Sequence, residues 1–234
     1  QRKIFLYGDG LTSESEPLIR QQYFDLLDSF NTLLTDTPFL LGDTVTLVDI
    51  AMMGPFFRHY FCDPEPAKIM RDQYPRVLEW VVKVWSAKAS QQNKTNPISD
   101  FSHKGWEIIL KEICQVYIPY LVRNARAWQA KEKSFDFQMN GVTLPNLPVI
   151  HYRVYCLEVL EKQYKSLGPE AKNKVDNVFK PYGPLQLDTG ICSGLAEEHK
   201  LPLAKRSKPI AWIEKMTIIL SGTPWDMPKS FRQP

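Results

Sequence analysis

Apolar residues recur at spacings of three and four along most of this chain between Leu18 and Tyr164. Such spacing places them on one face of an α-helix, so the pattern predicts a mainly helical protein. Pro119 lies inside one of these stretches and predicts a kink there, because proline lacks the N–H that a helical hydrogen bond needs. The predicted helices cover residues 18–35, 77–85, 104–130 and 150–168, with a shorter one around 69–70 that ends before Pro75.

The best-defined helix start lies at residues 46–49, Thr-Leu-Val-Asp. The spacing fits a capping box, in which the Thr46 oxygen accepts the N–H of Asp49 and the Asp49 carboxylate accepts the N–H of Thr46. The following helix, 47–60, is apolar almost all round, which is typical of a helix at the centre of a domain. Pro55 inside it predicts a second kink.

After residue 130 the hydrophobic period changes from helical to alternating. Alternation on both sides of Asn140-Gly141 predicts one small β-hairpin near 135–144. Seven of the 18 prolines lie between Pro181 and Pro234, so we expect an irregular, proline-rich tail in which only residues 210–221 form a regular element. The predicted organisation is a lead-in segment (1–16), a helical core (17–90), additional helices with the hairpin (91–178) and the tail (179–234).

Composition excludes several classes of function. The 234 residues carry 29 basic and 26 acidic side chains, interspersed, for a net charge of +3, so nucleic acid is not an expected partner. No apolar run approaches the roughly 20 residues of a membrane span, so we expect a soluble protein without a transmembrane segment. The four cysteines form no Cys-x-x-Cys pair, and three lie in helical patterns. We therefore expect reduced thiols in an intracellular compartment, with cytoplasmic and mitochondrial locations both open.

The sequence offers no constellation for catalysis. There is no Gly-rich phosphate loop, no Gly-x-Ser-x-Gly elbow and no close pair of histidines that one helix face would bring to a metal. Cys62, near His59, is interpreted as a buried thiol rather than a nucleophile, and the cap explains Asp49. We predict no catalytic, cofactor-binding or metal-binding residue.

One candidate site remains, near the end of the kinked helix. Phe56, Phe57 and Tyr60 form an aromatic cluster that would line an apolar pocket. Ordinary core packing is the alternative interpretation of the same residues.

Residues 39–51, Phe-Leu-Leu-Gly-Asp-Thr-Val-Thr-Leu-Val-Asp-Ile-Ala, resemble the start of the central helix in the C-terminal all-helical domain of the glutathione transferase superfamily. The resemblance covers roughly residues 17–90, and residues 104–165 more weakly resemble the extended tails of some microbial-type members. It implies a glutathione-transferase C-terminal-like helical bundle with an extra helical block. In that bundle Thr46 and Asp49 are the folding cap, and Gly42 makes the turn before it.

Members of the superfamily also have an N-terminal thioredoxin-like domain, which binds glutathione and supplies the residue that activates its thiol. Residues 1–16 hold no counterpart of that domain, so no catalytic residue is carried over and glutathione is expected only if such a domain is supplied. The resemblance leaves apolar surface that normally packs on the thioredoxin-like domain, which a protein partner is expected to cover.

Three functions follow from the resemblance. The first is a non-catalytic structural or scaffold subunit of a larger assembly. The second is the C-terminal, electrophile-site portion of a two-domain glutathione transferase. The third, a solitary ligand-binding helical domain, requires the pocket at Phe56, Phe57 and Tyr60.

Overall fold

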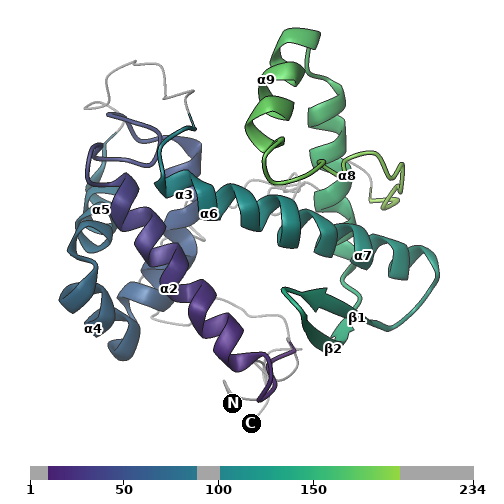
Figure 1. The fold of residues 1–234 in the computed structure, drawn as a ribbon, viewed down its shortest axis with the longest axis horizontal. Coiled ribbons are helices and arrows are strands. Elements are labelled where there is room, and N and C mark those ends of the chain that lie inside the picture. The colour runs from purple at the N-terminus through teal and green to yellow at the C-terminus, as the bar shows by residue number, and fades with distance from the viewer. Residues whose placement is uncertain (1–9, 89–100, 196–234) are drawn as a thin grey trace, which may run out of the picture. The chain divides into compact units, whose positions relative to one another are not determined.

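The computed structural model describes residues 10–88 and 101–195 of the chain. Contacts divide the chain into two units, residues 1–193 and 194–234, and all elements below belong to the first. The protein is mainly helical, as predicted (Figure 1). In chain order the elements are α2 (Glu16–Leu33), α3 (Leu47–Pro55), the π-helical turn η1 (Phe56–Phe61), α4 (Pro64–Gln73), α5 (Pro75–Ser86), α6 (Gly105–Glu112), the π-helical turn η3 (Ile113–Tyr117), α7 (Ile118–Gln129), β1 (Ser134–Met139), β2 (Val142–Pro148), α8 (His151–Lys165) and α9 (Pro169–Phe179).

The largest apolar core joins α2, η1, α4, α5 and the start of α6. At its centre the rings of Phe30 and Phe56 stack with centroids 4.8 Å apart, and the Trp80 ring meets both edge-on. A second cluster joins α7 and α8 to residues 187–191, and a third packs the hairpin against α7. Sequence periodicity therefore predicted most of the buried positions of α2, α5, α7 and α8, although Ile19 and Trp85 on the predicted apolar stripes are exposed.

The continuous run α6–η3–α7 links the first core to the other two (Figure 1). Its first part packs on α2, and its last part packs on α8 and β1. None of the described helices is long and apolar enough to cross a membrane.

The prediction that the helix at 47–60 lies at the centre of a domain is wrong for α3. In α3 only Asp49 is buried, so this helix lies at the surface rather than at the centre of a domain. Its contacts are with α5 and η1, which leave its apolar outer stripe uncovered. A helix that is apolar on all sides is expected to pack against other elements, but its sequence does not identify which side is buried.

Both prolines expected to kink a helix lie beside a π-helical turn. After Pro55, the N–H of Cys62 bonds to the carbonyl of Phe57, five residues back. Before Pro119, the N–H of Ile118 bonds to the carbonyl of Ile113 with the same spacing. Because proline cannot donate to the carbonyl four residues earlier, the helix shifts its hydrogen bonding by one residue near it.

The predicted hairpin is present, and β2 is longer than predicted. Asn140 and Gly141 both have positive φ (49° and 82°), which is the turn that the Asn-Gly pair indicates. The register shifts between Phe135 and Phe137, where the Asp136 carboxylate accepts the N–H of Asn146. The inner face, which includes Phe135, Phe137 and Leu147, packs on α7.

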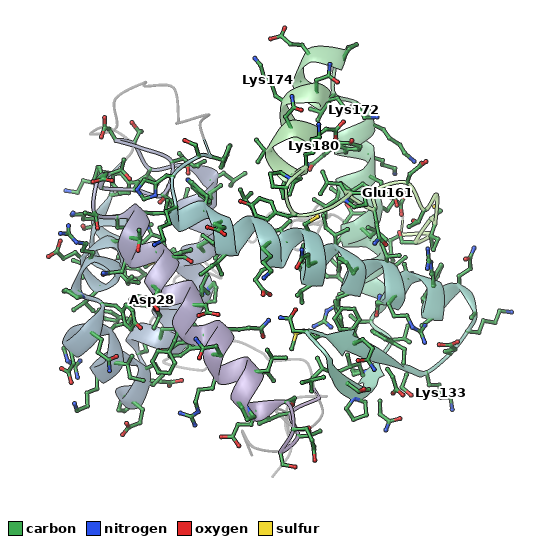
Figure 2. The ribbon with its side chains drawn as sticks, in the orientation of Figure 1. Asp28, Lys133, Glu161, Lys172, Lys174 and Lys180 are labelled. Carbon is green, nitrogen blue, oxygen red and sulfur yellow. The ribbon has the colours of Figure 1, made fainter. Side chains whose placement is uncertain are left out.

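Helix α9 is an addition that periodicity did not predict. It contains no buried residue, and Lys172, Lys174 and Lys180 are spread along it and just past its end (Figure 2). It is joined to α8 by polar contacts, since Tyr164 donates to Asp176 and the Lys172 ammonium lies 4.7 Å from the centre of the Tyr164 ring. The expected element at 210–221 lies outside the described residues, and the segment boundaries of the sequence analysis stay predictions.

Gly105 allows α6 to approach α2 closely. A Cβ at this position would lie 2.5 Å from Leu33 Cγ and 2.9 Å from the carbonyl oxygen of Ser29. Gly105→Ala should therefore lower the free energy of unfolding by about 2 kcal/mol, measured by urea titration. Gly54→Ala is the matched control: that position is helical and open, so the same change should be neutral or slightly stabilising. Equal effects of the two substitutions would refute this account.

Candidate functional site: an exposed apolar face

The outer stripe of α3 is apolar and exposed. Leu47 and Ile50 are 79% and 59% exposed, and Ala51 and Gly54 continue the same stripe at helical spacing. No Cβ contact would form within 4 Å at Gly54, so this part of the helix is open. Four apolar positions along one face of α3 are therefore exposed to solvent.

Helix α5 also carries exposed apolar side chains. Trp85 is 67% exposed and Val82 50% exposed, although the other side of α5 is fully buried. The Trp85 ring stacks on Phe57 with centroids 4.4 Å apart, and Phe57 in turn stacks on Phe61. The apolar face, as used below, is the name for these apolar residues of α3, η1 and α5, each exposed or stacked on Trp85: Leu47, Ile50, Ala51, Gly54, Phe57, Val82 and Trp85.

A buried carboxylate fixes α3 beside α5. The predicted capping box of Thr46 and Asp49 is present, and Asp49 Oδ2 accepts the Thr46 N–H (2.9 Å) and hydroxyl (2.7 Å). The second oxygen, Oδ1, accepts the backbone N–H of Leu40 and the indole N–H of Trp80, each at 2.9 Å. Asp49 thus joins the preceding loop, the helix start and α5.

The turn before α3 has the glycine that the resemblance implies. Gly42 has a φ of 118°, and it exchanges two backbone hydrogen bonds with Phe39. A side chain at position 42 would be strained in this conformation, so glycine is needed to close the loop. The Leu40 and Trp80 partners of Asp49 were not predicted, because nothing local in the sequence marks them.

The structure brings together the three residues of the candidate pocket. Phe56 is buried in the core, and its ring meets Tyr60 edge-on at 4.9 Å. Tyr60 also contacts Tyr23 at 5.0 Å, and burial raises the pKa of its hydroxyl. Phe57 faces the other way, onto Trp85. Phe56 is thus a core residue, Tyr60 and Phe57 pack against the same core from different sides, and a ligand pocket formed by the three stays a prediction.

The histidines and cysteines have separate surroundings. His103 lies 3.0 Å from an Asp36 oxygen, His151 donates to the carbonyl of Ser193 (2.6 Å), and His199 lies outside the described residues. Within residues 10–88 and 101–195, no three His, Cys, Asp or Glu side chains are grouped so that they could hold a metal. Cys62, Cys114, Cys156 and Cys192 are all unpaired, and Cys62, expected to be buried, is exposed.

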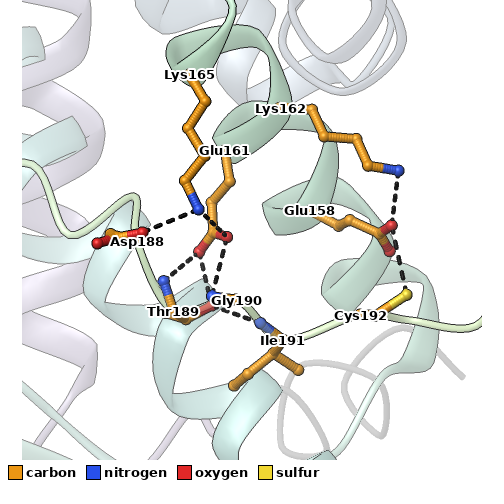
Figure 3. A network of polar contacts seen from close by, with 9 residues as sticks. All are labelled: Glu158, Glu161, Lys162, Lys165, Asp188, Thr189, Gly190, Ile191 and Cys192. Atoms are coloured by element: carbon orange, nitrogen blue, oxygen red, sulfur yellow. Dashed lines mark hydrogen bonds and ion pairs between the residues drawn. The ribbon is translucent and has the colours of Figure 1, made fainter.

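Two glutamates on α8 form a polar site that sequence analysis missed (Figure 3). Glu161 accepts the N–H and hydroxyl of Thr189 and the N–H of Gly190. Glu158 accepts the N–H (2.8 Å) and hydroxyl (2.6 Å) of Ser193 and pairs with Lys162 at 2.8 Å. These bonds lower the pKa of Glu158 to about 2, with Lys162 as the largest cause. Both carboxylates are occupied by the 188–193 segment, so we assign them a structural role.

The fold and the cap define a class of helical domain, and comparison with known proteins identifies it. Residues 14–82 match the family model of the glutathione S-transferase C-terminal domain, which confirms the resemblance over most of its predicted extent. This segment, from the start of α2 into α5, belongs to that family. No curated protein and no solved structure matches the chain. The weaker resemblance of residues 104–165 stays a prediction.

Proposed function

We propose that this chain is a non-catalytic structural or scaffold subunit of a larger protein assembly and that a protein partner covers its apolar face. The observation that carries the proposal is the exposure of Leu47, Ile50 and Trp85 on adjacent helices. Exposed apolar side chains cost free energy in water, and groups of them on neighbouring elements mark interaction sites. A partner that packs on α3 and α5 removes this cost.

The alternative is that the chain is the electrophile-site portion of a two-domain glutathione transferase. The family match over residues 14–82 supports this function as well as the first. In this case a thioredoxin-like domain would cover the apolar face and would bind glutathione with its own residues. The two proposals differ in whether the covering element is part of the same polypeptide.

The intact mass of the endogenous protein, measured denatured and then under native conditions, separates these proposals. A denatured mass near 27.1 kDa together with a larger native mass would support the subunit. A denatured mass higher by ~10 kDa, the size of a small domain, would support the transferase. A native mass of 27.1 kDa would contradict both.

Replacing an apolar residue by a charge at the centre of the face tests the subunit proposal directly. Ile50→Glu should weaken association with the partner by about 30-fold, because the carboxylate must be desolvated against an apolar surface. The measurement is the fraction of the tagged chain that elutes in the native assembly rather than at its own size. Tyr152→Glu on α8, a site 54% exposed and outside the apolar face, is the matched control and should leave this fraction unchanged. Equal effects of the two variants, or none, would exclude the apolar face as the interface.

We also propose a reducing compartment for the protein, supported by four unpaired cysteines. Denatured extracts prepared without reductant should therefore react with a thiol alkylator at all four positions. Protection of any pair would indicate an oxidising location.

A further inference from the structure

A cavity of about 320 Å³ lies between α2 and the α6–η3–α7 run, away from the apolar face. Most of its wall is apolar, formed by residues such as Leu26, Ile109, Ile113 and Val116. This volume falls at the small end of the range of ligand pockets, which combine apolar walls with a few polar groups. The polar groups therefore indicate which ligand would fit.

The polar groups of this cavity are acidic. Asp25 and Glu112 both line it, together with Gln22, whose amide donates to Glu112 Oε2 at 2.9 Å. Among the described residues, no Lys, Arg or His lies within ion-pair distance, 4.0 Å, of either carboxylate. Burial is the main influence on Glu112 and raises its pKa, and the nearby Asp25 charge acts in the same direction. The Gln22 bond and the Lys111 charge lower the pKa of Glu112 by less. Neither carboxylate therefore has an ion-pair partner among the described residues.

Two tyrosine rings complete the wall. Tyr117 and Tyr120 both line the cavity, and Tyr117 is the last residue of η3. The Tyr120 ring is held in place, since Phe137 meets it edge-on at 5.4 Å and the Arg153 guanidinium lies 4.9 Å from its centre. Aromatic faces near carboxylates attract organic cations through the ring quadrupole, and at Tyr120 one such position is already taken by the Arg153 guanidinium. The π-helical turn, which also supplies Ile113 and Val116, shapes this side of the cavity.

We propose that the cavity binds a small organic cation, an ammonium group carried on an apolar body. The ammonium group lies toward Glu112 and Asp25, and the apolar body contacts the isoleucine and tyrosine side chains. A neutral ligand of the same shape would leave the two carboxylates without a counter-charge, and an anion would be repelled by them. The inference does not depend on the apolar face, which is formed by other helices.

Three probes of matched shape test this inference on the full chain at pH 7. They are 2-phenylethylamine, which is cationic, 2-phenylethanol, its neutral isostere, and phenylacetate, which is anionic. We expect saturable binding of the amine, about tenfold tighter than that of the alcohol, and no binding of phenylacetate, measured by calorimetry or by ligand-observed NMR.

Variants then identify the carboxylate responsible. Glu112→Gln keeps the shape of the side chain and should weaken amine binding about tenfold without changing that of the alcohol. Glu107→Gln, on the same helix but outside the cavity wall, should bind the amine as the parent does. Asp25→Asn provides a second test at the cavity, and the helical circular dichroism of each variant reports whether it is folded.

Three results would overturn the proposal. The first is the absence of saturable amine binding at millimolar concentration. The second is equal affinity for amine and alcohol. The third is undiminished amine binding by both folded cavity variants. None of these results depends on an assembly partner, so failure here is distinguishable from failure of the proposed function.

Discussion

Replacing Asp49 by alanine should lower the free energy of unfolding by about 4 kcal/mol, a large share of the stability of an ordinary domain. The carboxylate is fully buried and accepts hydrogen bonds from Leu40, Thr46 and Trp80. Alanine removes the acceptor and leaves these donors without it, and the two buried ones, the Leu40 N–H and the Trp80 indole N–H, then carry a desolvation penalty. The measurement is urea unfolding followed by Trp fluorescence and by helical circular dichroism.

Thr46→Ala separates the contribution of the capping box to stability from that of the Asp49 bonds to Leu40 and Trp80. It removes the threonine half of the capping box but keeps the Asp49 bonds to the backbone N–H groups and to Trp80, so about 1 kcal/mol should be lost. Asp49→Asn should fall between the two alanine variants, because its amide retains one oxygen acceptor. A loss of less than 1 kcal/mol in Asp49→Ala would show that α3 is held by packing rather than by this carboxylate.

The Asp49 junction also bears on the apolar face. Because Asp49 connects α3 to α5 through Trp80, its loss should release the helix that carries Leu47 and Ile50. The cap and the orientation of α3 thus depend on the same carboxylate. Its bonds to Thr46 start the helix, and its bond to the Trp80 indole fixes the direction of the outer stripe of α3. Sequence analysis found the first of these and missed the second.

The features predicted correctly are those encoded by neighbouring residues. Helical stripes, the Asn140-Gly141 turn and the pairing of Thr46 with Asp49 each depend on a window of a few residues. The exposure of α3 depends instead on which elements lie beside it, and an apolar sequence on all sides is compatible with burial or with an interface. This explains why the same residues predicted a central helix and formed a surface one.

The α8 glutamates illustrate a different limit. Glu158 and Glu161 are three residues apart on a helix that also carries Lys162 and Lys165, a pattern typical of a solvated, salt-bridged face. Their partners lie about 30 residues further along the chain, in a segment without regular structure. The sequence does show hydroxyl residues at 189 and 193. They can be recognised as partners of the glutamates only once the structure shows that this segment lies along α8.

Glu158→Gln should lower the free energy of unfolding by about 3 kcal/mol at neutral pH. An acid whose pKa falls from 4.5 to about 2 on folding stabilises the folded state by roughly this amount when ionised. The Glu158 side chain is only 11% exposed, so solvent screens its hydrogen bonds to Ser193 little. Glutamine cannot attract Lys162, and it replaces the charged acceptor of the Ser193 bonds by a weaker neutral one.

The pH dependence of this difference gives the decisive measurement. Because the folded-state pKa is lowered, the stabilisation by Glu158 is fully present above about pH 4.5 and is lost as the pH falls toward 2. The stabilities of parent and variant should therefore converge in acid. Glu170→Gln is the matched control: Glu170 also pairs with a lysine four residues on, but both side chains are exposed, so its loss should cost less than about 0.5 kcal/mol at any pH.

Two further variants separate the causes of the low pKa of Glu158. Lys162→Ala should raise that pKa more than Ser193→Ala does, because the lysine is the largest of its causes. The Lys162 side chain is 66% exposed, so 1 M salt should weaken the contribution of Lys162 to the low pKa of Glu158. The contribution of the buried Ser193 bonds should persist. The free energies of unfolding of the parent and of Glu158→Gln are the quantities to compare. If their difference stays constant from pH 7 to pH 2, the 188–193 segment is held on α8 without the charge of Glu158.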